Sequence, residues 1–109
     1  MAAFAGELPE ANHNEIEGWA HGREHGPFSA VFLASPGLHP RVQRRIELYS
    51  EVLEAEGAPV VHVSSRGDTP VAEVLSLVML GDLASVALAE LGGVDPAAME
   101  AIEGFKARL

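Results

Sequence analysis

Hydrophobic positions along this chain follow two different spacings, and each spacing predicts a different element. Short, mainly apolar runs occupy residues 28–34 and 59–64, with glycine or proline close to both ends of each run. Such runs are typical of buried strands. Apolar residues recur every three or four positions over residues 38–56 and 70–91, a spacing that predicts helices. Strands alternating with helices predict an α/β fold, in which a parallel sheet is flanked by helices.

The helix predicted over residues 38–56 has one apolar side and ends at Gly57. The apolar side is formed by Leu38, Val42, Ile46, Tyr49 and Leu53. Three basic residues occupy other positions of the same helix: Arg41, Arg44 and Arg45. Such arginines more commonly belong to a solvated helix face, and contact with a phosphate is the alternative.

The longest predicted helix, over residues 70–91, is apolar around much of its circumference. Thr69 and Pro70 supply an N-cap and first-turn pair, although Thr69 and the serines before it are also placed to hold an anion after a strand. The run is long enough to span a membrane, but Asp82 lies in its middle and acidic residues flank it. We therefore expect no membrane contact and predict a core or subunit-contact helix.

A last helix is predicted after the Asp95–Pro96 pair, which has the composition of a helix cap and first turn. Its apolar face is formed by Met99, Ile102, Phe105 and Leu109. At about 100° per residue, Lys106 projects along this same face, which we expect to be buried. An ammonium group there either meets a partner or ligand, or packs its stem and extends its charged end to water.

A histidine precedes the predicted helix nearest the N-terminus, after a short apolar strand predicted over residues 2–6. Asn14 and Glu17 have the spacing of a capping box, which places His13 at the start of the helix. The positive end of a helix disfavours the imidazolium form, so we expect a neutral His13 that can give or take a proton. From the local pattern alone, a histidine that fixes a turn is favoured over a catalytic one.

Composition limits the functions open to the chain. It has 109 residues, of which 48% are hydrophobic, so residues 1–109 form one small domain or part of a larger one. The net charge of -9 argues against nucleic acid and anionic membranes as partners. There is no cysteine and no secretory signal, and we therefore expect a cytoplasmic protein without disulfides.

His21 and His25 have the i, i+4 spacing of a zinc-binding pair. Gly22, Gly26 and Pro27 disfavour a continuous helix there, and the sequence supplies no evident third ligand. We therefore predict no metal site and no cofactor.

Several motifs, taken together and in this order, give the chain a family resemblance. They are Pro9-Glu10 with Asn12-His13-Asn14-Glu15-Ile16, then Gly81-Asp82-Leu83-Ala84-Ser85, Val94-Asp95-Pro96 and the closing Phe105-Lys106-Ala107-Arg108-Leu109. In these motifs the chain resembles the bifunctional phosphoglucose/phosphomannose isomerases of the sugar isomerase (SIS) domain family. The resemblance covers essentially the whole chain, as the C-terminal half of the second SIS domain. It implies a partial, flavodoxin-like doubly wound SIS domain with a C-terminal helix.

The same resemblance implies an aldose–ketose isomerase that interconverts glucose 6-phosphate or mannose 6-phosphate with fructose 6-phosphate. The family's ring-opening histidine falls on His13, and its C-terminal lysine falls on Lys106. Its carboxylate base and Ser/Thr-rich phosphate loop would lie before Met1, and Ala97-Ala98 replaces a Thr-Pro pair found in related sequences. We therefore expect a phosphorylated sugar as substrate, with a complementing N-terminal SIS portion or a second copy as partner. Substrate-binding residues stay unassigned.

Two other interpretations stay open. In one, the chain is a non-catalytic sugar-phosphate-binding or dimerisation module that keeps the SIS fold without the base. In the other, it is an unrelated flavodoxin-like binding domain and the motif matches are accidental. An adjoining upstream segment with a helix glutamate and a Ser/Thr loop would favour the enzyme over the module.

Overall fold

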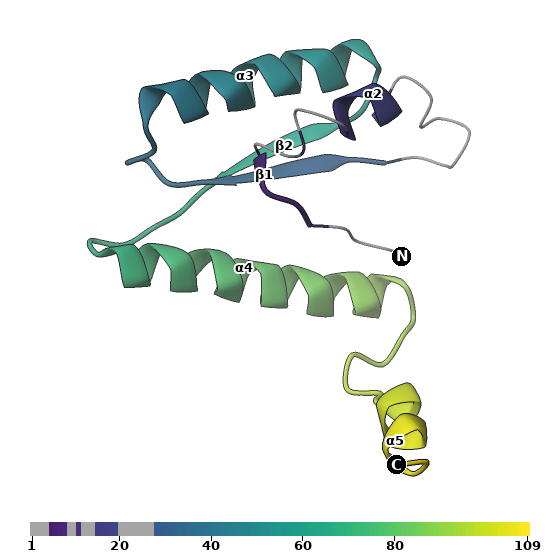
Figure 1. Cartoon of the computed structure of the whole chain (residues 1–109). Helices are drawn as coiled ribbons and strands as arrows, with labels where there is room; N and C mark the ends of the chain where they lie inside the picture. Colours follow the sequence, from purple (N-terminus) through teal and green to yellow (C-terminus); the bar gives the residue numbers. More distant parts are fainter. Residues whose placement is uncertain (1–4, 9–10, 12–14, 20–27) are drawn as a thin grey trace. The chain divides into compact units, whose positions relative to one another are not determined.

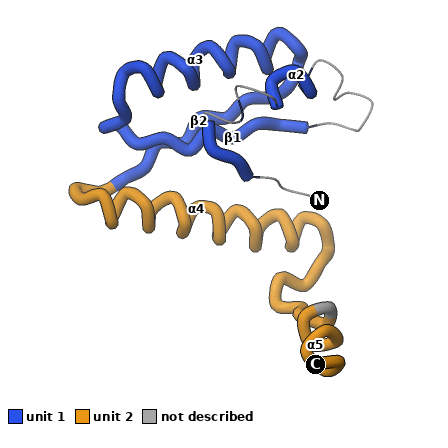
Figure 2. The backbone as a smooth tube through the Cα atoms, in the orientation of Figure 1, with its two compact units in different colours: residues 1–66 blue, residues 67–109 orange. Residues whose placement is uncertain are grey.

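A computed structural model describes residues 5–8, 11, 15–19 and 28–109 of the chain. The chain divides into two compact units, residues 1–66 and residues 67–109 (Figure 2). Each unit is described by itself below.

The first unit contains a small parallel sheet. Strand β1 (Ala30–Ala34) pairs with strand β2 (Val60–Ser64) in a register that runs from Ala30 opposite Val60 to Ala34 opposite Ser64. Helix α3 (Pro40–Ala55) connects the strands, and α3 and the short helix α2 (Ile16–Trp19) lie on one side of the sheet (Figure 1). This strand–helix–strand arrangement confirms the predicted α/β class with a parallel sheet.

Helix α3 has defined ends. The Nδ1 atom of His39 accepts a hydrogen bond from the backbone N–H of Arg41 at 3.2 Å, and Pro40 opens the first turn. After the helix, Gly57 has a φ of 78°, a conformation that glycine adopts without strain. The core of the unit lies under this helix, where Tyr49 is 4% exposed and Leu53 is fully buried.

The sheet is covered on one face only within the described part of residues 1–66. Phe32 is half-buried against α3, but Val31 and Leu33, which alternate with it, are 55% and 58% exposed. On β2, Val61, the partner of Val31, is 49% exposed, and Val63, the partner of Leu33, is half-buried. The prediction of two buried strands is therefore wrong for Val31, Leu33 and Val61. Parallel sheets ordinarily have both faces covered.

In the second unit, helix α4 (Pro70–Leu91) begins and ends at the predicted residues. Thr69 is the N-cap, and its Oγ1 accepts a hydrogen bond from the backbone N–H of Ala72 at 3.2 Å. Much of the apolar surface of α4 is exposed, including Val74, Leu75, Val78 and Met79 at 61%, 59%, 52% and 62%. Among the described helices, α4 alone has the length and apolar composition needed to cross a membrane, a test that core helices of soluble proteins also pass.

The chain after α4 departs from the predicted helix start. The Oδ1 atom of Asp95 accepts from the backbone N–H of Ala97 at 2.9 Å, and the Asp95 carbonyl accepts from Ala98 at 3.2 Å. These bonds close a tight turn instead of opening a helix. Helix α5 (Glu100–Lys106) begins later, after the N-cap residue Met99, whose side chain makes no capping bond. The predicted C-terminal helix therefore exists, but its predicted start is wrong.

Candidate functional site

The predicted ring-opening histidine, His13, lies outside the described residues, as do His21 and His25 and most of the strand predicted over residues 2–6. The capping role of Asn14 lies outside them too. The structure does describe Ala11, before His13 in the sequence, and Glu15, after it.

The residues before His13 approach the residues after it. On the N-terminal side, the backbone N–H of Ala11 donates to the carbonyl of Glu7 at 3.0 Å. A β-carbon placed on Gly6 would lie 3.3 Å from Oε1 of Glu15. Gly6 and Glu15 are therefore neighbours in space, and a larger residue at Gly6 would press on the Glu15 carboxylate.

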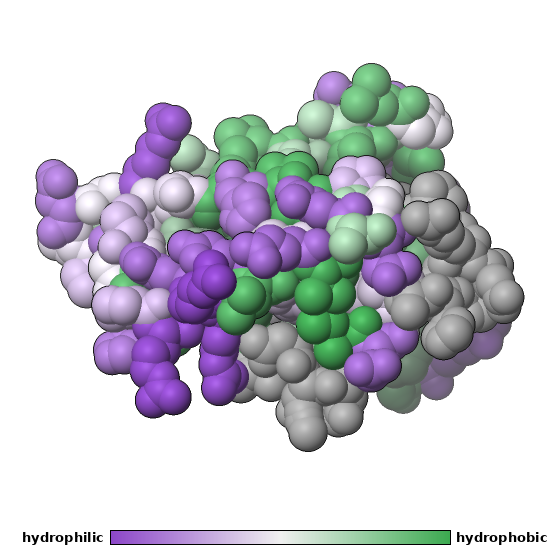
Figure 3. All heavy atoms as spheres, turned by 90° about the horizontal axis from the view of Figure 1, so that it is seen from above, coloured by the Kyte–Doolittle hydropathy of each residue, from purple (hydrophilic) through white to green (hydrophobic). Residues whose placement is uncertain are grey.

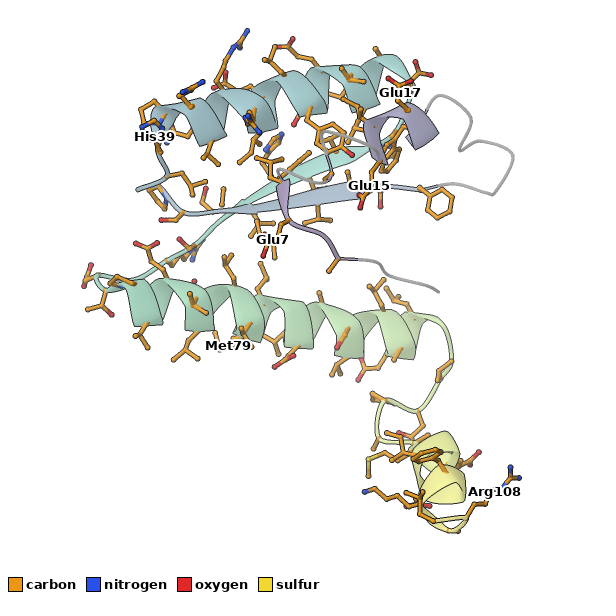
Figure 4. The ribbon with its side chains drawn as sticks, in the orientation of Figure 1. Glu7, Glu15, Glu17, His39, Met79 and Arg108 are labelled. Carbon is orange, nitrogen blue, oxygen red and sulfur yellow. The ribbon has the colours of Figure 1, made fainter. Side chains whose placement is uncertain are left out.

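Two carboxylates follow His13 closely in the sequence. Glu15 precedes α2 directly, and Glu17 lies in the first turn of the helix, where a negative charge interacts favourably with the helix dipole. Figure 4 shows the two side chains on opposite sides of α2. They therefore face different surroundings, and Glu15 is the one placed beside Gly6.

Helix α2 is attached to α3 by one hydrogen bond between side chains. The indole N–H of Trp19 donates to the hydroxyl oxygen of Tyr49 at 3.1 Å. The Trp19 ring also meets Phe28 edge to face, with ring centroids 6.5 Å apart. Burial raises the pKa of the Tyr49 hydroxyl above its ordinary value, the Trp19 hydrogen bond partly opposes this increase, and the Glu15 carboxylate adds to it.

Tyr49 packs in an aromatic cluster with residues of both strands. Phe32 of β1 meets the Tyr49 ring edge to face at 5.6 Å and stacks on the imidazole of His62 at 5.4 Å. Ser50 donates to the carbonyl of Ile46 at 2.8 Å, and its Oγ lies 3.2 Å from Nε2 of His62. Because the single hydroxyl proton of Ser50 goes to Ile46, we assign the proton of the second contact to Nε2 of His62.

The Ser50–His62 contact is therefore structural rather than a nucleophile and its base. An activated serine would donate its proton to the imidazole, whereas here that proton points to a backbone carbonyl. Sequence reasoning missed this contact, because His62 stands alone in an apolar strand and Ser50 lies among charged residues of a helix. Strand register and helix packing bring the two together, and neither is visible in a local pattern.

The arginines of α3 form a solvated surface. Nη1 of Arg44 lies 2.9 Å from Oε2 of Glu47 and 3.9 Å from Oε1 of Glu51, and all three side chains are mostly exposed. The hydrogen bond with Glu47 raises the pKa of Arg44. Figure 3 shows hydrophilic side chains gathered on this side of the molecule, seen from above. The geometry favours the solvated-face interpretation of these arginines over the phosphate contact.

Lys106 is the last residue of α5 and is exposed. Its neighbours on the predicted apolar face, Ile102 and Phe105, are 52% and 65% exposed, so this face is not buried as predicted. The apolar face of α5 is exposed because no described element of the second unit covers it. Among the described residues, no hydrogen bond or ion pair engages the Lys106 ammonium group. In the same residues, no group of three or more His, Cys, Asp or Glu side chains is placed to hold a metal ion.

Comparison with known proteins assigns the chain to a family. Residues 1–109 match the model of the bacterial phospho-glucose isomerase C-terminal SIS domain. The chain belongs to this family. The SIS resemblance drawn from its motifs is thereby confirmed, and the small parallel sheet with its helices is consistent with part of a SIS domain.

Curated relatives of this SIS domain are enzymes with a single shared name. The bifunctional phosphoglucose/phosphomannose isomerase of Aquifex aeolicus is 35% identical over 102 residues, which cover 94% of this chain and 32% of the relative. The proteins of the same name from Pyrobaculum calidifontis and Caldicellulosiruptor bescii are 37% and 31% identical, over 94% and 98% of this chain and 29% and 32% of their own lengths.

The SIS domain described here thus spans about a third of the length of these relatives. It is a member of a sugar-phosphate isomerase family, and the site roles of His13 and Lys106 stay predictions. No solved structure significantly matches the chain.

Proposed function

We propose that this SIS domain works in an aldose–ketose isomerase that interconverts glucose 6-phosphate or mannose 6-phosphate with fructose 6-phosphate. The observation that carries the proposal is the match of all 109 residues to a phospho-glucose isomerase SIS domain. The names of the curated relatives support both sugars as substrates.

His13 is proposed to open the sugar ring. Ring opening breaks the C1–O5 bond, removes the proton from O1 and delivers a proton to O5, so the carbonyl forms at C1. A neutral imidazole near the start of a helix is suited to accept the first proton and return it. The isomerisation then moves a proton between C2 and C1 through an enediol, which requires a carboxylate base. None of the described carboxylates is assigned that role.

Lys106 is proposed to supply positive charge to the substrate. A chain with a net charge of -9 attracts a sugar phosphate weakly unless a cation lies at the site. An ammonium group offers three hydrogen-bond donors to phosphate or hydroxyl oxygens. Lys106 is exposed, and no described residue neutralises it, so it is available for such a role.

The proposed partner is a complementing N-terminal SIS portion or a second copy of the chain, in a cytoplasmic assembly. Val31, Leu33 and Val61 form an exposed face of the sheet. This exposure supports a partner that covers the face, because parallel sheets ordinarily have both faces covered. A sheet of two strands is also marginal by itself, which favours further strands from a partner. The proposed assembly would provide the carboxylate base and the phosphate loop.

A purified assembly of this chain with an N-terminal SIS portion tests the proposal. We expect it to convert glucose 6-phosphate to fructose 6-phosphate, and we expect the isolated chain to be inactive. His13→Ala should lower turnover of the cyclic sugar on the order of a hundred-fold or more, while an aldose phosphate without ring-closing hydroxyls loses far less. His25→Ala is the matched control and should retain activity.

The alternative function is a non-catalytic sugar-phosphate-binding or dimerisation module. This alternative rests on the same SIS domain match, which assigns no catalytic residue. An assembly that binds glucose 6-phosphate but never isomerises it would support the module and contradict the enzyme. Equal losses on cyclic and open-chain sugars in His13→Ala would contradict the ring-opening role alone.

A further inference from the structure

We propose that the outward face of α3 pairs with the same face of a second copy of the chain, with the two helices antiparallel. The outward face is the side of α3 turned away from the core residues Tyr49 and Leu53. Its residues are all exposed within one chain: Arg41, Arg44, Arg45, Leu48, Glu51 and Val52. The pairing uses no residue of the proposed isomerase chemistry, so it does not depend on the proposed function.

The charges of α3 are separated along the helix. All three of its arginines lie within residues 41–45, and its glutamates follow at positions 47, 51 and 54. These three arginines are nearly half of the seven Lys and Arg residues in a chain with a net charge of -9. The helix is therefore basic near its start and acidic toward its end.

This order of charges is the reverse of the one that stabilises an isolated helix. The N-terminus of a helix carries partial positive charge and favours acidic side chains, whereas the C-terminus favours basic ones. Helix α3 has no acidic residue in its first turn and no basic residue in its last turn. Its side-chain charges therefore add to the helix dipole, and a neighbouring helix of opposite polarity would offset both.

Two apolar side chains lie on the outward face beside these charges. Leu48 and Val52 are 45% and 40% exposed. They are four residues apart, so they lie about 40° from each other around the helix and share one side of it. Burying them against a partner supplies affinity that exposed ion pairs alone do not supply, because such pairs contribute little in water.

A second copy of α3 matches this pattern when it runs in the opposite direction. Two-fold symmetry then places the basic part of each helix against the acidic part of the other, with Leu48 of both copies close to the axis. Arg44 and Glu51 are on the same side of α3, since Nη1 and Oε1 lie 3.9 Å apart within one chain. In the antiparallel pair each Arg44 would thus face the partner's Glu51. A parallel pair would oppose like charges.

Charge reversal on α3 tests the proposal by sedimentation equilibrium of the 109-residue chain. Every sample carries Met79→Lys, which should weaken association through the exposed apolar surface of α4. Helix α3 has 16 residues and is about 24 Å long, so its face forms a small interface and we expect a weak dimer. Arg44→Glu and Glu51→Arg should each raise the dissociation constant about ten-fold or more, because like charges then face each other.

A mixture of these two variants distinguishes a contact between chains from one within a chain. Each variant breaks the contact between Arg44 and Glu51 inside its own chain. In a mixed dimer the two reversed residues face each other with opposite signs, and so do the two unreversed ones. The mixture should therefore dimerise within about three-fold of the parent chain, although neither variant does so alone. This recovery also shows that both variants are folded.

Arg108→Glu is the matched control, because it reverses the same charge at an exposed residue outside α3. It should change the dissociation constant by no more than about two-fold. A parent chain that stays monomeric, an unchanged dimer in Arg44→Glu, or a mixture no tighter than its components would overturn the proposal. So would an N-terminal SIS portion that replaces the second copy and binds less tightly to Arg44→Glu, because the outward face would then belong to that portion.

Discussion

Trp19 and Tyr49 lie 30 positions apart in the sequence, yet the indole N–H of Trp19 donates to the Tyr49 hydroxyl at 3.1 Å. They are the only tryptophan and the only tyrosine of the chain. The bond therefore joins the two residues whose absorbance and fluorescence are easiest to follow. Every change at this contact can be observed without labels.

The ionisation of Tyr49 should make the stability of the folded chain depend on pH in the alkaline range. Burial raises its pKa in the folded chain above the value of about 10 expected when unfolded, so the neutral hydroxyl is favoured by folding. The resulting stabilisation is fully present below the unfolded pKa and is lost as pH rises through the folded pKa. Tyrosinate absorbance should appear at higher pH in the native chain than in urea, and Trp19 fluorescence should change with it. Coincident titrations in both states would contradict the expectation.

Gly67→Ala should destabilise the second unit. Gly67 has a φ of 134°, and an added β-carbon would lie 2.5 Å from Cβ of Ala72 and 3.0 Å from its carbonyl carbon. Backbone strain of this kind costs about 1–3 kcal/mol, and the overlap with α4 adds to it. Urea unfolding followed by far-ultraviolet circular dichroism measures the loss.

Gly81→Ala is the matched control for that substitution. Gly81 lies inside α4, and a β-carbon there meets nothing within 4 Å. Alanine should therefore stabilise the helix by about 0.5–1 kcal/mol. Equal effects of the two substitutions would show that the close approach of Gly67 to Ala72 is not maintained in solution.

The apolar surface of α4 predicts that the isolated chain self-associates. Val78 and Met79 are 52% and 62% exposed, and large apolar patches of this kind mark association surfaces (Figure 4 labels Met79). Met79→Lys should weaken the association, whereas Arg41→Lys on the solvated face of α3 should not. Sedimentation equilibrium at increasing concentration measures the mass. A monomer throughout the micromolar range would contradict this expectation.

Local rules predicted the elements whose boundaries are set by neighbouring residues. The bounds of α4 follow from the Thr69 cap, Pro70 in the first turn and an uninterrupted apolar run. The same reasoning failed at Asp95, where the side chain bonded to Ala97 and closed a turn instead of capping α5. Both outcomes use the same chemistry of a short polar side chain, and only the path of the following backbone separates them.

Contacts between segments that are distant in the sequence could not be predicted from local sequence patterns. The Trp19–Tyr49 bond and the Phe32–His62 stack require the packing of α2, α3 and two strands, which no spacing pattern encodes. The exposure of Val31 and Leu33 also follows from which elements are present, because an apolar strand looks the same with or without its cover. For the site, motifs identified His13 and Lys106 through family resemblance, and their roles stay predictions.

Lys106→Gln tests the proposed role of Lys106. The substitution removes a positive charge that is proposed to face the negatively charged phosphate of the substrate. In the assembled isomerase we expect kcat/KM for glucose 6-phosphate to fall about ten-fold or more, because a hydrogen bond to a charged group is worth about 1.5–3 kcal/mol. Arg108→Gln is the matched control, since it removes the same charge from an exposed residue two positions beyond Lys106. The loss in Lys106→Gln should remain at high ionic strength, whereas a small effect of Arg108→Gln should disappear as salt screens it. If both variants lose activity equally and salt abolishes both losses, Lys106 contributes only to the general field around the site and makes no direct substrate contact.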